Sequence, residues 1–262
     1  MLSLLFRLMV LTIMALTLAG CARSDALWAV TDNVCMVNYH YTGHPSPCQQ
    51  IYIPEGKRQG FSIIQNPRYP YHFILVPTIP VSGIESPWLF MPGRPDYFGY
   101  AWLMRYQLMS QYGRPVPEDM LGMAINSAWG RSQNQLHIHL TCLREDVYRQ
   151  LRAERPYIQD AWHPLPDKLL THTYYARRVL QPTAMGIYPI ASVAHYFRLT
   201  PPMLAEYGVA LVPTTFSGEK KGFILLATRR GWDKGNRASV ESLLDKRCDI
   251  LGSGSAKPLR FR

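Results

Sequence analysis

The chain has 262 residues, and 28 Lys and Arg against 18 Asp and Glu give it a formal charge of +10. Hydrophobic residues make up 47% and charged residues 18%, which is typical of a globular protein and excludes a disordered chain. The excess of positive charge indicates an anionic partner, namely nucleic acid, a phosphate-bearing ligand or an acidic membrane surface.

The N-terminus has the features of an export signal. Residues 8–19 form an apolar or weakly polar run of 12 residues, whereas a bilayer span needs about 20 and a signal-peptide core about 7–15. The run ends in Leu18-Ala19-Gly20-Cys21, which resembles the bacterial lipoprotein box, where the cysteine thiol takes a diacylglyceryl group. We expect residues 1–20 to be a lipoprotein signal peptide and Cys21 its lipidation site. An uncleaved membrane anchor is the alternative, and both export the rest of the chain.

Four cysteines remain if Cys21 is lipidated, and an even number in an exported chain indicates disulfides. Three connectivities are possible. Cys35 and Cys48 are 13 residues apart in a segment that a local crosslink would stabilise, which favours that pair and leaves Cys142 with Cys248. Buried free thiols are the alternative. A catalytic or zinc-binding role is disfavoured because no Cys-x-x-Cys occurs.

The first half of the chain begins with residues 21–60, which we expect to be an irregular segment. Prolines and glycines separate the apolar runs that follow it. The predicted elements are strands at 61–64 and 72–76, a proline-rich loop at 81–96, a helix at 97–112, a strand at 121–125, a turn-rich connector at 127–132 and a strand at 135–143.

The second half continues with alternating helices and strands. The predicted elements are a helix at 144–154, a strand at 174–180, a helix at 192–199, strands at 207–212 and 222–228 joined as a hairpin, and a closing helix at 239–249. The pattern predicts one α+β domain over residues 61–251, an antiparallel sheet with helices packed on it. Residues 252–262 form a polar, basic tail.

The strongest chemical signal lies in the strand predicted at 135–143. Gln135, His137 and His139 alternate there with aliphatic residues, so a strand places both imidazoles and the amide on one face. Polar groups on an inward face need partners. Three explanations of this polar face are open: a metal site, a histidine nucleophile, or a polar layer whose groups bond to one another. The metal site lacks an evident third ligand, and we expect neither a metal nor a cofactor.

The connector before the histidines favours a nucleophile. It is rich in hydroxyl, amide and guanidinium donors that suit phosphate oxygens. A neutral imidazole is a good nucleophile near pH 7, and attack on phosphorus forms a phosphoramidate. We expect Arg131 to be solvated and Glu85 to cap a turn. The phosphate-binding candidates are Asn126, Ser132, Gln133, Asn134 and Gln135.

The alternation of histidines with apolar residues resembles the motif of the histidine-triad superfamily. In that superfamily the middle histidine attacks a nucleoside α-phosphate. The resemblance implies a histidine-triad-like fold and the nucleophile at His137, with His139 at the third histidine position. The first position is Gln135 here, so an amide stands where the motif has an imidazole.

A wider set of motifs over residues 30–251 resembles one branch, the CDP-diacylglycerol pyrophosphatase family. The motifs are ESP at 85–87, YGRPVP at 112–117, AINS at 124–127, GR at 130–131, QN at 133–134, HIH at 137–139, REDV at 144–147, YARRV at 175–179, LATR at 226–229 and NRAS at 236–239. The positions of the four cysteines also fit. Members are usually held by an N-terminal membrane span, whereas this chain has a lipoprotein box.

The resemblance implies hydrolysis of CDP-diacylglycerol to CMP and phosphatidate through a cytidylyl group carried on His137. A nucleotidyl transferase with another acceptor, and a non-catalytic nucleotide- or lipid-binding lipoprotein, are the alternatives. Without residues 1–20 the chain keeps 27 basic and 18 acidic residues, or +9. That charge suits an anionic lipid substrate and a membrane surface, and export without a nucleic-acid motif excludes nucleic acid. We expect the domain to face the periplasm, at the inner membrane because of the substrate, or at the outer membrane because of the lipoprotein box.

Overall fold

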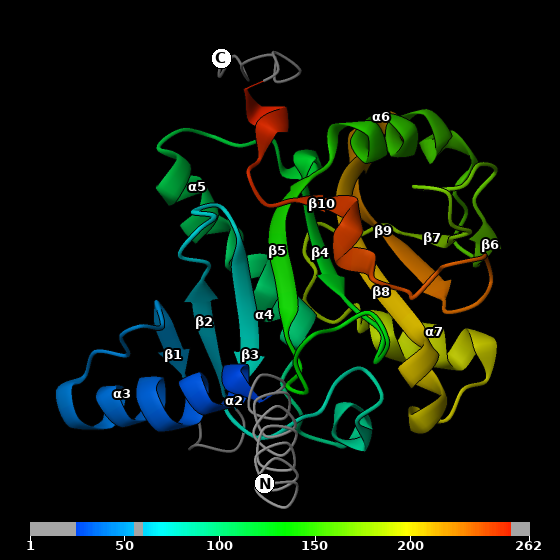
Figure 1. Ribbon diagram of the computed structural model, residues 1–262. Helices are drawn as coiled ribbons and strands as arrows, with labels where there is room; N and C mark the ends of the chain where they lie inside the picture. Colours follow the sequence, from blue (N-terminus) through cyan, green and yellow to red (C-terminus); the bar gives the residue numbers. More distant parts are fainter. Residues whose placement is uncertain (1–24, 55–59, 253–262) are drawn as a thin grey trace, which may run out of the picture.

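The computed structural model describes residues 25–54 and 60–252, which form an α+β fold around one large antiparallel sheet (Figure 1). The predicted α+β class and antiparallel sheet are therefore confirmed. The predicted signal peptide, the lipidation site at Cys21 and residues 253–262 of the tail lie outside the described residues. No helix of the described part has the length and apolar character that a bilayer crossing requires.

The sheet of the described residues has ten strands in the order β1-β2-β3-β5-β4-β8-β9-β7-β6, with β10 paired to β5 off this path. In Figure 1, β5 and β4 lie between β1–β3 on one side and β7–β9 on the other. The strands are β1 (Gln50–Tyr52), β2 (Phe61–Gln65), β3 (Phe73–Pro77), β4 (Leu121–Ile125), β5 (Ile138–Leu143), β6 (His163–Pro164), β7 (Tyr175–Val179), β8 (Tyr207–Phe216), β9 (Lys220–Arg229) and β10 (Leu244–Asp245).

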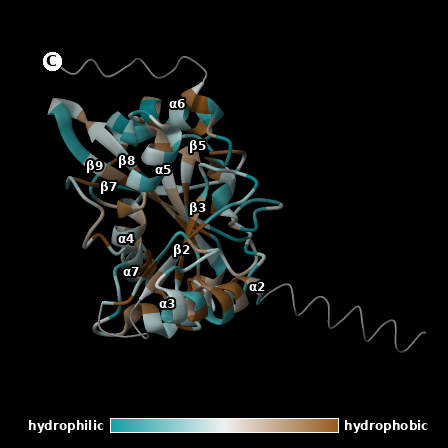
Figure 2. Cartoon of the chain, turned by 90° about the vertical axis from the view of Figure 1, so that its left-hand side faces the viewer, coloured by the Kyte–Doolittle hydropathy of each residue, from teal (hydrophilic) through white to brown (hydrophobic). Residues whose placement is uncertain are grey.

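Helices pack against this sheet, as predicted. The α-helices are α2 (Ala26–Ala29), α3 (Val37–Thr42), α4 (Tyr97–Leu103), α5 (Arg105–Tyr112), α6 (Glu145–Glu154) and α7 (Pro189–Phe197). α4 contacts β3, β4 and β5, and α7 contacts β8. β4 and β5 are buried along their whole length, as expected of strands covered on both faces. Figure 2 shows hydrophobic residues gathered along the inner strands. The core therefore encloses the strand that carries His139.

The predicted hairpin is present and longer than expected. β8 and β9 pair over ten positions, from Tyr207 opposite Arg229 to Phe216 opposite Lys220. The turn is Ser217–Glu219, where Gly218 adopts φ 70°, a conformation that costs glycine little.

The described residues of the predicted irregular segment 21–60, from 25 to 54, are less irregular than expected. α2, a π-helical stretch (Val30–Met36) and α3 run without a break from Ala26 to Thr42, and Gly43 ends α3 in the left-handed conformation. The turn-forming residues of this segment gather at 43–47, after the helix, so nothing upstream interrupts it. β1 then joins the sheet beside β2.

Both expected disulfides are present. The Cys35–Cys48 disulfide joins the π-helical stretch to the loop before β1. The Cys142–Cys248 disulfide joins β5 to the C-terminal segment. All four cysteines are buried. The choice among three connectivities is thus confirmed.

The predicted helix at 239–249 is wrong. The segment is a 3₁₀ turn (Val240–Leu243), then β10, then a second 3₁₀ turn (Asp249–Leu251). Leu244 and Asp245 pair with the end of β5, and the disulfide holds Cys248 with φ 59°. Strand pairing and the crosslink together override the local helix propensity.

Two predicted boundaries also differ. The helix at 97–112 breaks at Met104 into α4 and α5. The strand predicted at 135–143 begins only at Ile138, so Gln135 and His137 precede it. Leu75 is the last β3 residue paired with β5, and Pro77, which would face Leu136, has no N–H to donate. Leu136 N–H instead donates to the Val81 carbonyl, 2.5 Å away.

Candidate active site

His137 lies directly before β5, and a backbone carbonyl two residues earlier in the chain orients its imidazole. Its Nδ1 lies 2.7 Å from the Gln135 carbonyl oxygen. A carbonyl can only accept, so Nδ1 carries the proton and donates it. The other ring nitrogen, Nε2, then keeps a free lone pair. A neutral imidazole with a free Nε2 lone pair is the form in which histidine can act as a base or a nucleophile.

His139 lies directly against His137. The two ring centroids are 4.8 Å apart and the rings meet edge to face. Although His137 precedes the strand, both imidazoles are on the same side, as the alternation predicted. Both residues are buried.

A third histidine, His72, completes the cluster. It precedes β3, whose Ile74 pairs with His139, so His72 projects from the same face as a diagonal neighbour. His72 Nε2 lies 2.9 Å from His139 Nδ1, and the two rings are stacked. Sequence analysis missed His72 because only the β3–β5 register brings it to the motif.

The hydrogen bonds of Asn66 determine which ring nitrogens of His72 and His139 donate and which accept. Its Oδ1 accepts the backbone N–H groups of Arg68 and Tyr69, so its other amide atom is the nitrogen. That Nδ2 donates to His72 Nδ1 over 3.2 Å. His72 Nε2–H therefore donates to His139 Nδ1, and the proton of His139 is on Nε2. A carboxylate oxygen of Glu241 lies 3.1 Å from that atom.

Burial keeps these imidazoles neutral. Burial, aided by the charge of Lys246, lowers the pKa of His72 to about 3. Burial and the neighbouring histidines hold the pKa of His139 well below its usual range. Burial also lowers the pKa of His137, although its bond to the Gln135 carbonyl and the charge of Glu241 act in the opposite direction. The lowered pKa of His137 thus favours the unprotonated imidazole at neutral pH.

The candidate phosphate-binding residues separate into two groups. Ser132 and Asn134 are exposed and keep their side chains available for a ligand. The other three are engaged within the protein. Gln133 Oε1 accepts the Leu27 N–H, and Asn126 Oδ1 accepts the Glu241 N–H.

Gln135 serves the fold of the adjoining loop. Its Oε1 accepts the Val81 N–H at 3.1 Å, and its Nε2 donates to the carbonyls of Pro77 and Ile79. A buried amide that makes three such bonds has no free donor. The position that resembles the first histidine of the motif therefore secures the chain after β3.

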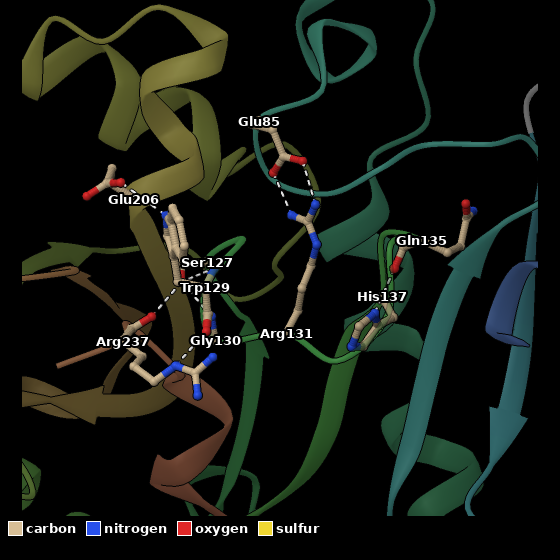
Figure 3. A network of polar contacts seen from close by, with 9 residues as sticks. All are labelled: Glu85, Ser127, Trp129, Gly130, Arg131, Gln135, His137, Glu206 and Arg237. Carbon is tan, nitrogen blue, oxygen red and sulfur yellow. Dashed lines mark hydrogen bonds and ion pairs between the residues drawn. The ribbon is translucent and has the colours of Figure 1, made fainter. Parts of the chain in front are cut away.

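Arg131 is not solvated, contrary to expectation. Its guanidinium makes a two-point ion pair with Glu85, at 2.7 and 2.8 Å, and the side chains are only 10% and 18% exposed (Figure 3). Burial alone would raise the pKa of the Glu85 carboxyl, but the hydrogen bonds and charge of Arg131 lower it overall. The pair anchors the loop at 81–96 to the connector before His137.

The connector itself is bound to the C-terminal segment. Ser127 Oγ donates to the Arg237 carbonyl at 2.5 Å, and Arg237 Nε donates to the Trp129 carbonyl at 2.8 Å (Figure 3). The Trp129 ring donates through Nε1 to Glu206. The connector before β5 and the C-terminal segment, which are distant in sequence, are thus bound to each other around the histidines.

Within the described residues, no three His, Cys, Asp or Glu side chains are arranged to hold a metal ion. The fold and the histidine cluster define the class of protein: an α+β enzyme built around a buried cluster of three neighbouring imidazoles. The comparisons narrow this class. The chain belongs to the CDP-diacylglycerol pyrophosphatase family, whose sequence model matches residues 22–252. A Yersinia pestis protein named CDP-diacylglycerol pyrophosphatase is 35% identical over 230 residues, covering 88% of this chain and 86% of that protein.

Proposed function

We propose that this chain hydrolyses the pyrophosphate bond of CDP-diacylglycerol to give CMP and phosphatidate, with His137 as the nucleophile. Membership of the family and the named relative support the substrate and the reaction. The observation that carries the mechanism is the Nδ1–H of His137 bound to the Gln135 carbonyl, which leaves Nε2 unprotonated.

The reaction then has two displacements. His137 Nε2 attacks the phosphorus that bears cytidine, a P–N bond forms, and the P–O bond to the bridging oxygen breaks. Phosphatidate leaves with that electron pair. Water next attacks the cytidylyl-histidine, and the P–N bond breaks with its electron pair returning to Nε2. CMP departs with the oxygen of water, and the displaced water proton passes to solvent. Splitting one displacement into two lowers each barrier.

The surroundings support this route. The imidazole becomes cationic when Nε2 is phosphorylated, and the Gln135 carbonyl that accepts Nδ1–H stabilises that charge. The exposed donors Ser132 and Asn134 are the side chains available for phosphate oxygens. We also propose that the site is histidine-triad-like, on the strength of the alternating Gln135, His137 and His139.

The test is CMP release from CDP-diacylglycerol by wild type, His137→Ala and the matched control His195→Ala, whose side chain is exposed on α7. We expect His195→Ala to match wild type and His137→Ala to lose at least about 10²-fold. Rapid acid-free quench with α-³²P-labelled substrate should trap labelled protein that is stable to base and labile to acid. Retained turnover by His137→Ala would refute the nucleophile.

The same assay separates the alternatives. Adding glycerol or inorganic phosphate as acceptor and analysing the products reveals a nucleotidyl transferase, because CMP then appears joined to the acceptor. A non-catalytic binding lipoprotein would bind the substrate and release no CMP. Treatment with a chelator shows whether a metal ion takes part.

We further propose that the chain is exported and held at the membrane through lipidated Cys21, facing the periplasm. Two disulfides in the folded part support an oxidising compartment. Cys21→Ala should move the protein from the membrane fraction to the soluble fraction and remove the mass of the lipid. An unchanged distribution would favour an uncleaved anchor instead.

A further inference from the structure

We propose that Glu241, which lies outside the histidine motif, is a positioning residue for the reaction: it orients His139 and offsets the positive charge that develops on His137. This inference rests on the proposed function and deepens it. Glu241 belongs to the 3₁₀ turn Val240–Leu243, more than a hundred residues after the histidines.

The contact with His139 is the first support. His139 Nε2 is completely buried and, within the described residues, lacks a hydrogen-bond partner of good angular geometry. The nearest acid is the Glu241 carboxylate, with Oε2 at 3.1 Å. Because His72 donates to Nδ1 of His139, the proton of His139 is on Nε2, the ring atom that lies 3.1 Å from that carboxylate. A buried N–H without an acceptor is costly, so the carboxylate selects this tautomer and ring orientation.

The second support is how firmly the protein holds Glu241. Its backbone N–H donates to Asn126 Oδ1 at 2.9 Å. Three residues later, Leu244 pairs with Leu143 at the end of β5. The Cys142–Cys248 disulfide closes the same segment onto β5. The carboxylate and His139 are thus connected to the same strand by independent bonds, which is the arrangement expected of a preorganised group.

The third support is charge. The charged or titratable groups that act on His137 come from both sides of the site: Arg131 in the connector, Glu241 and Lys246 in the C-terminal segment, and the neighbouring imidazoles of His72 and His139. Arg131 and Lys246 lower the pKa of His137, whereas the carboxylate of Glu241 raises it. Glu241 therefore favours the cationic imidazole, the form that His137 takes when Nε2 is bonded to phosphorus.

Lys246 moderates this effect. Its Nζ lies 3.3 Å from Glu241 Oε2, the same oxygen that faces His139. The ammonium therefore partly offsets the charge of the carboxylate beside the histidines. Removing the charge of Glu241 and removing that of Lys246 should therefore shift the pH dependence of the enzyme in opposite directions.

The experiment compares wild type with Glu241→Gln and Lys246→Met in the full chain, using CDP-diacylglycerol. The matched control is Glu145→Gln, a carboxylate on α6 that pairs with Arg149 at the surface. We expect Glu241→Gln to lower kcat by about 10²-fold with little change in KM. The control should match wild type. Glu241→Asp, which keeps the charge, should recover part of the loss.

The pH profile gives the sharper readout. The acid limb of kcat/KM reports deprotonation of the nucleophile in the free enzyme. Loss of the Glu241 charge lowers the pKa of His137, so that limb moves to lower pH. Loss of the Lys246 charge moves it to higher pH. A merely structural role for Glu241 would not produce shifts of opposite sign.

A measurement independent of turnover completes the test. ¹⁵N NMR of the imidazoles in wild type should show the Nε2–H tautomer of His139, and Glu241→Ala should weaken that preference. Wild type without CMP release refutes the proposed function. Wild-type turnover together with unchanged kcat, pH profile and tautomer in the Glu241 variants refutes the positioning role alone.

Discussion

At the scale of single residues, the chemistry is decided by which nitrogen of each imidazole carries the proton. Three hydrogen bonds determine this: His137 Nδ1–H donates to the Gln135 carbonyl, Asn66 donates to Nδ1 of His72, and His72 donates to Nδ1 of His139. None of these tautomers depends on a charge on histidine. The cluster is therefore built to stay neutral.

Neutral burial makes the protein sensitive to acid. The pKa of His72 is lowered from 6.5 to about 3. Below pH 6.5 the His72 imidazole binds a proton in the unfolded chain but not in the native state. The stabilisation from its neutral burial is therefore fully present above pH 6.5 and is lost as the pH falls toward 3. We expect the free energy of unfolding to fall by up to about 1.4 kcal/mol per pH unit from this residue.

Urea unfolding of wild type and His72→Gln between pH 7.5 and 5 checks this. The variant should be less stable at pH 7.5 because the bonds to Asn66 and His139 are changed, yet its stability should depend less on pH. An equal dependence of unfolding free energy on pH in the two proteins would contradict the lowered pKa of His72. The control is His195→Ala, an exposed histidine on α7 outside the cluster, measured over the same pH range.

At the scale of elements, three segments that are not strands hold the site: the loop at 81–96, the connector before β5, and the C-terminal segment. Gln135 and the Glu85–Arg131 pair bind the loop to the connector. Asn126 and Ser127 bind the connector to the C-terminal segment. Two residues that the sequence indicated for phosphate, Asn126 and Gln135, are thus positioning elements of the scaffold.

Breaking the Glu85–Arg131 pair should be costly. Glu85→Gln leaves the largely buried guanidinium without its counter-ion, and we expect a loss of about 3 kcal/mol in the free energy of unfolding at pH 7. The pKa of Glu85 is lowered from 4.5, so the contribution is complete above pH 4.5 and fades as the pH falls through the lower folded value.

Urea denaturation at pH 7 and at pH 3.5 measures both effects. Gly83→Ala is the second variant, because a Cβ at that position would collide with the Arg131 guanidinium. It should be destabilised in the same way. Glu145→Gln, at an exposed pair, is the control and should change stability by less than about 1 kcal/mol. A Glu85→Gln protein as stable as the control would contradict the structural role.

The two disulfides should differ in consequence. Cys142 and Cys248 are 106 residues apart and Cys35 and Cys48 are 13 apart. In the loop-entropy model the longer loop contributes about 4.7 kcal/mol and the shorter about 3. Because the longer one also holds the segment of Glu241, its removal should cost activity as well as stability.

Paired Cys→Ser variants of each disulfide test this, measured by thermal unfolding and by CMP release well below the Tm. Loss of Cys142–Cys248 should reduce kcat even where the protein is folded, and loss of Cys35–Cys48 should leave kcat nearly unchanged. Equal kcat values in both folded variants would show that the crosslink does not serve the site.

At the scale of the whole molecule, the formal charge of +10 is the dominant feature. A cationic protein gathers an anionic lipid substrate by long-range attraction, and salt screens that attraction. We expect KM for CDP-diacylglycerol in mixed micelles to rise with ionic strength while kcat stays constant. Measuring both across a salt titration tests this, and a KM independent of salt would exclude steering by charge.

Much of the site was predictable because it is local in sequence. The alternation at 135–140 indicated the two histidines, and their contact is found even though β5 begins only at Ile138. Glu241 and His72 could not be predicted in the same way. Each reaches His139 through strand pairing or a turn of the C-terminal segment, and neither carries a periodic signal of its own.

The sequence by itself determined the α+β class and the central strands and favoured both disulfide pairs, because hydrophobic period and turn residues are local properties and the cysteines can be counted directly. Only the tertiary structure decided which nitrogen of each imidazole carries the proton and which residues lie against the histidines. Tautomers, ion pairs such as Arg131–Glu85 and the course of residues 239–249 depend on partners dozens of residues away. Local propensity carries no information about such partners, and their bonds outweigh it.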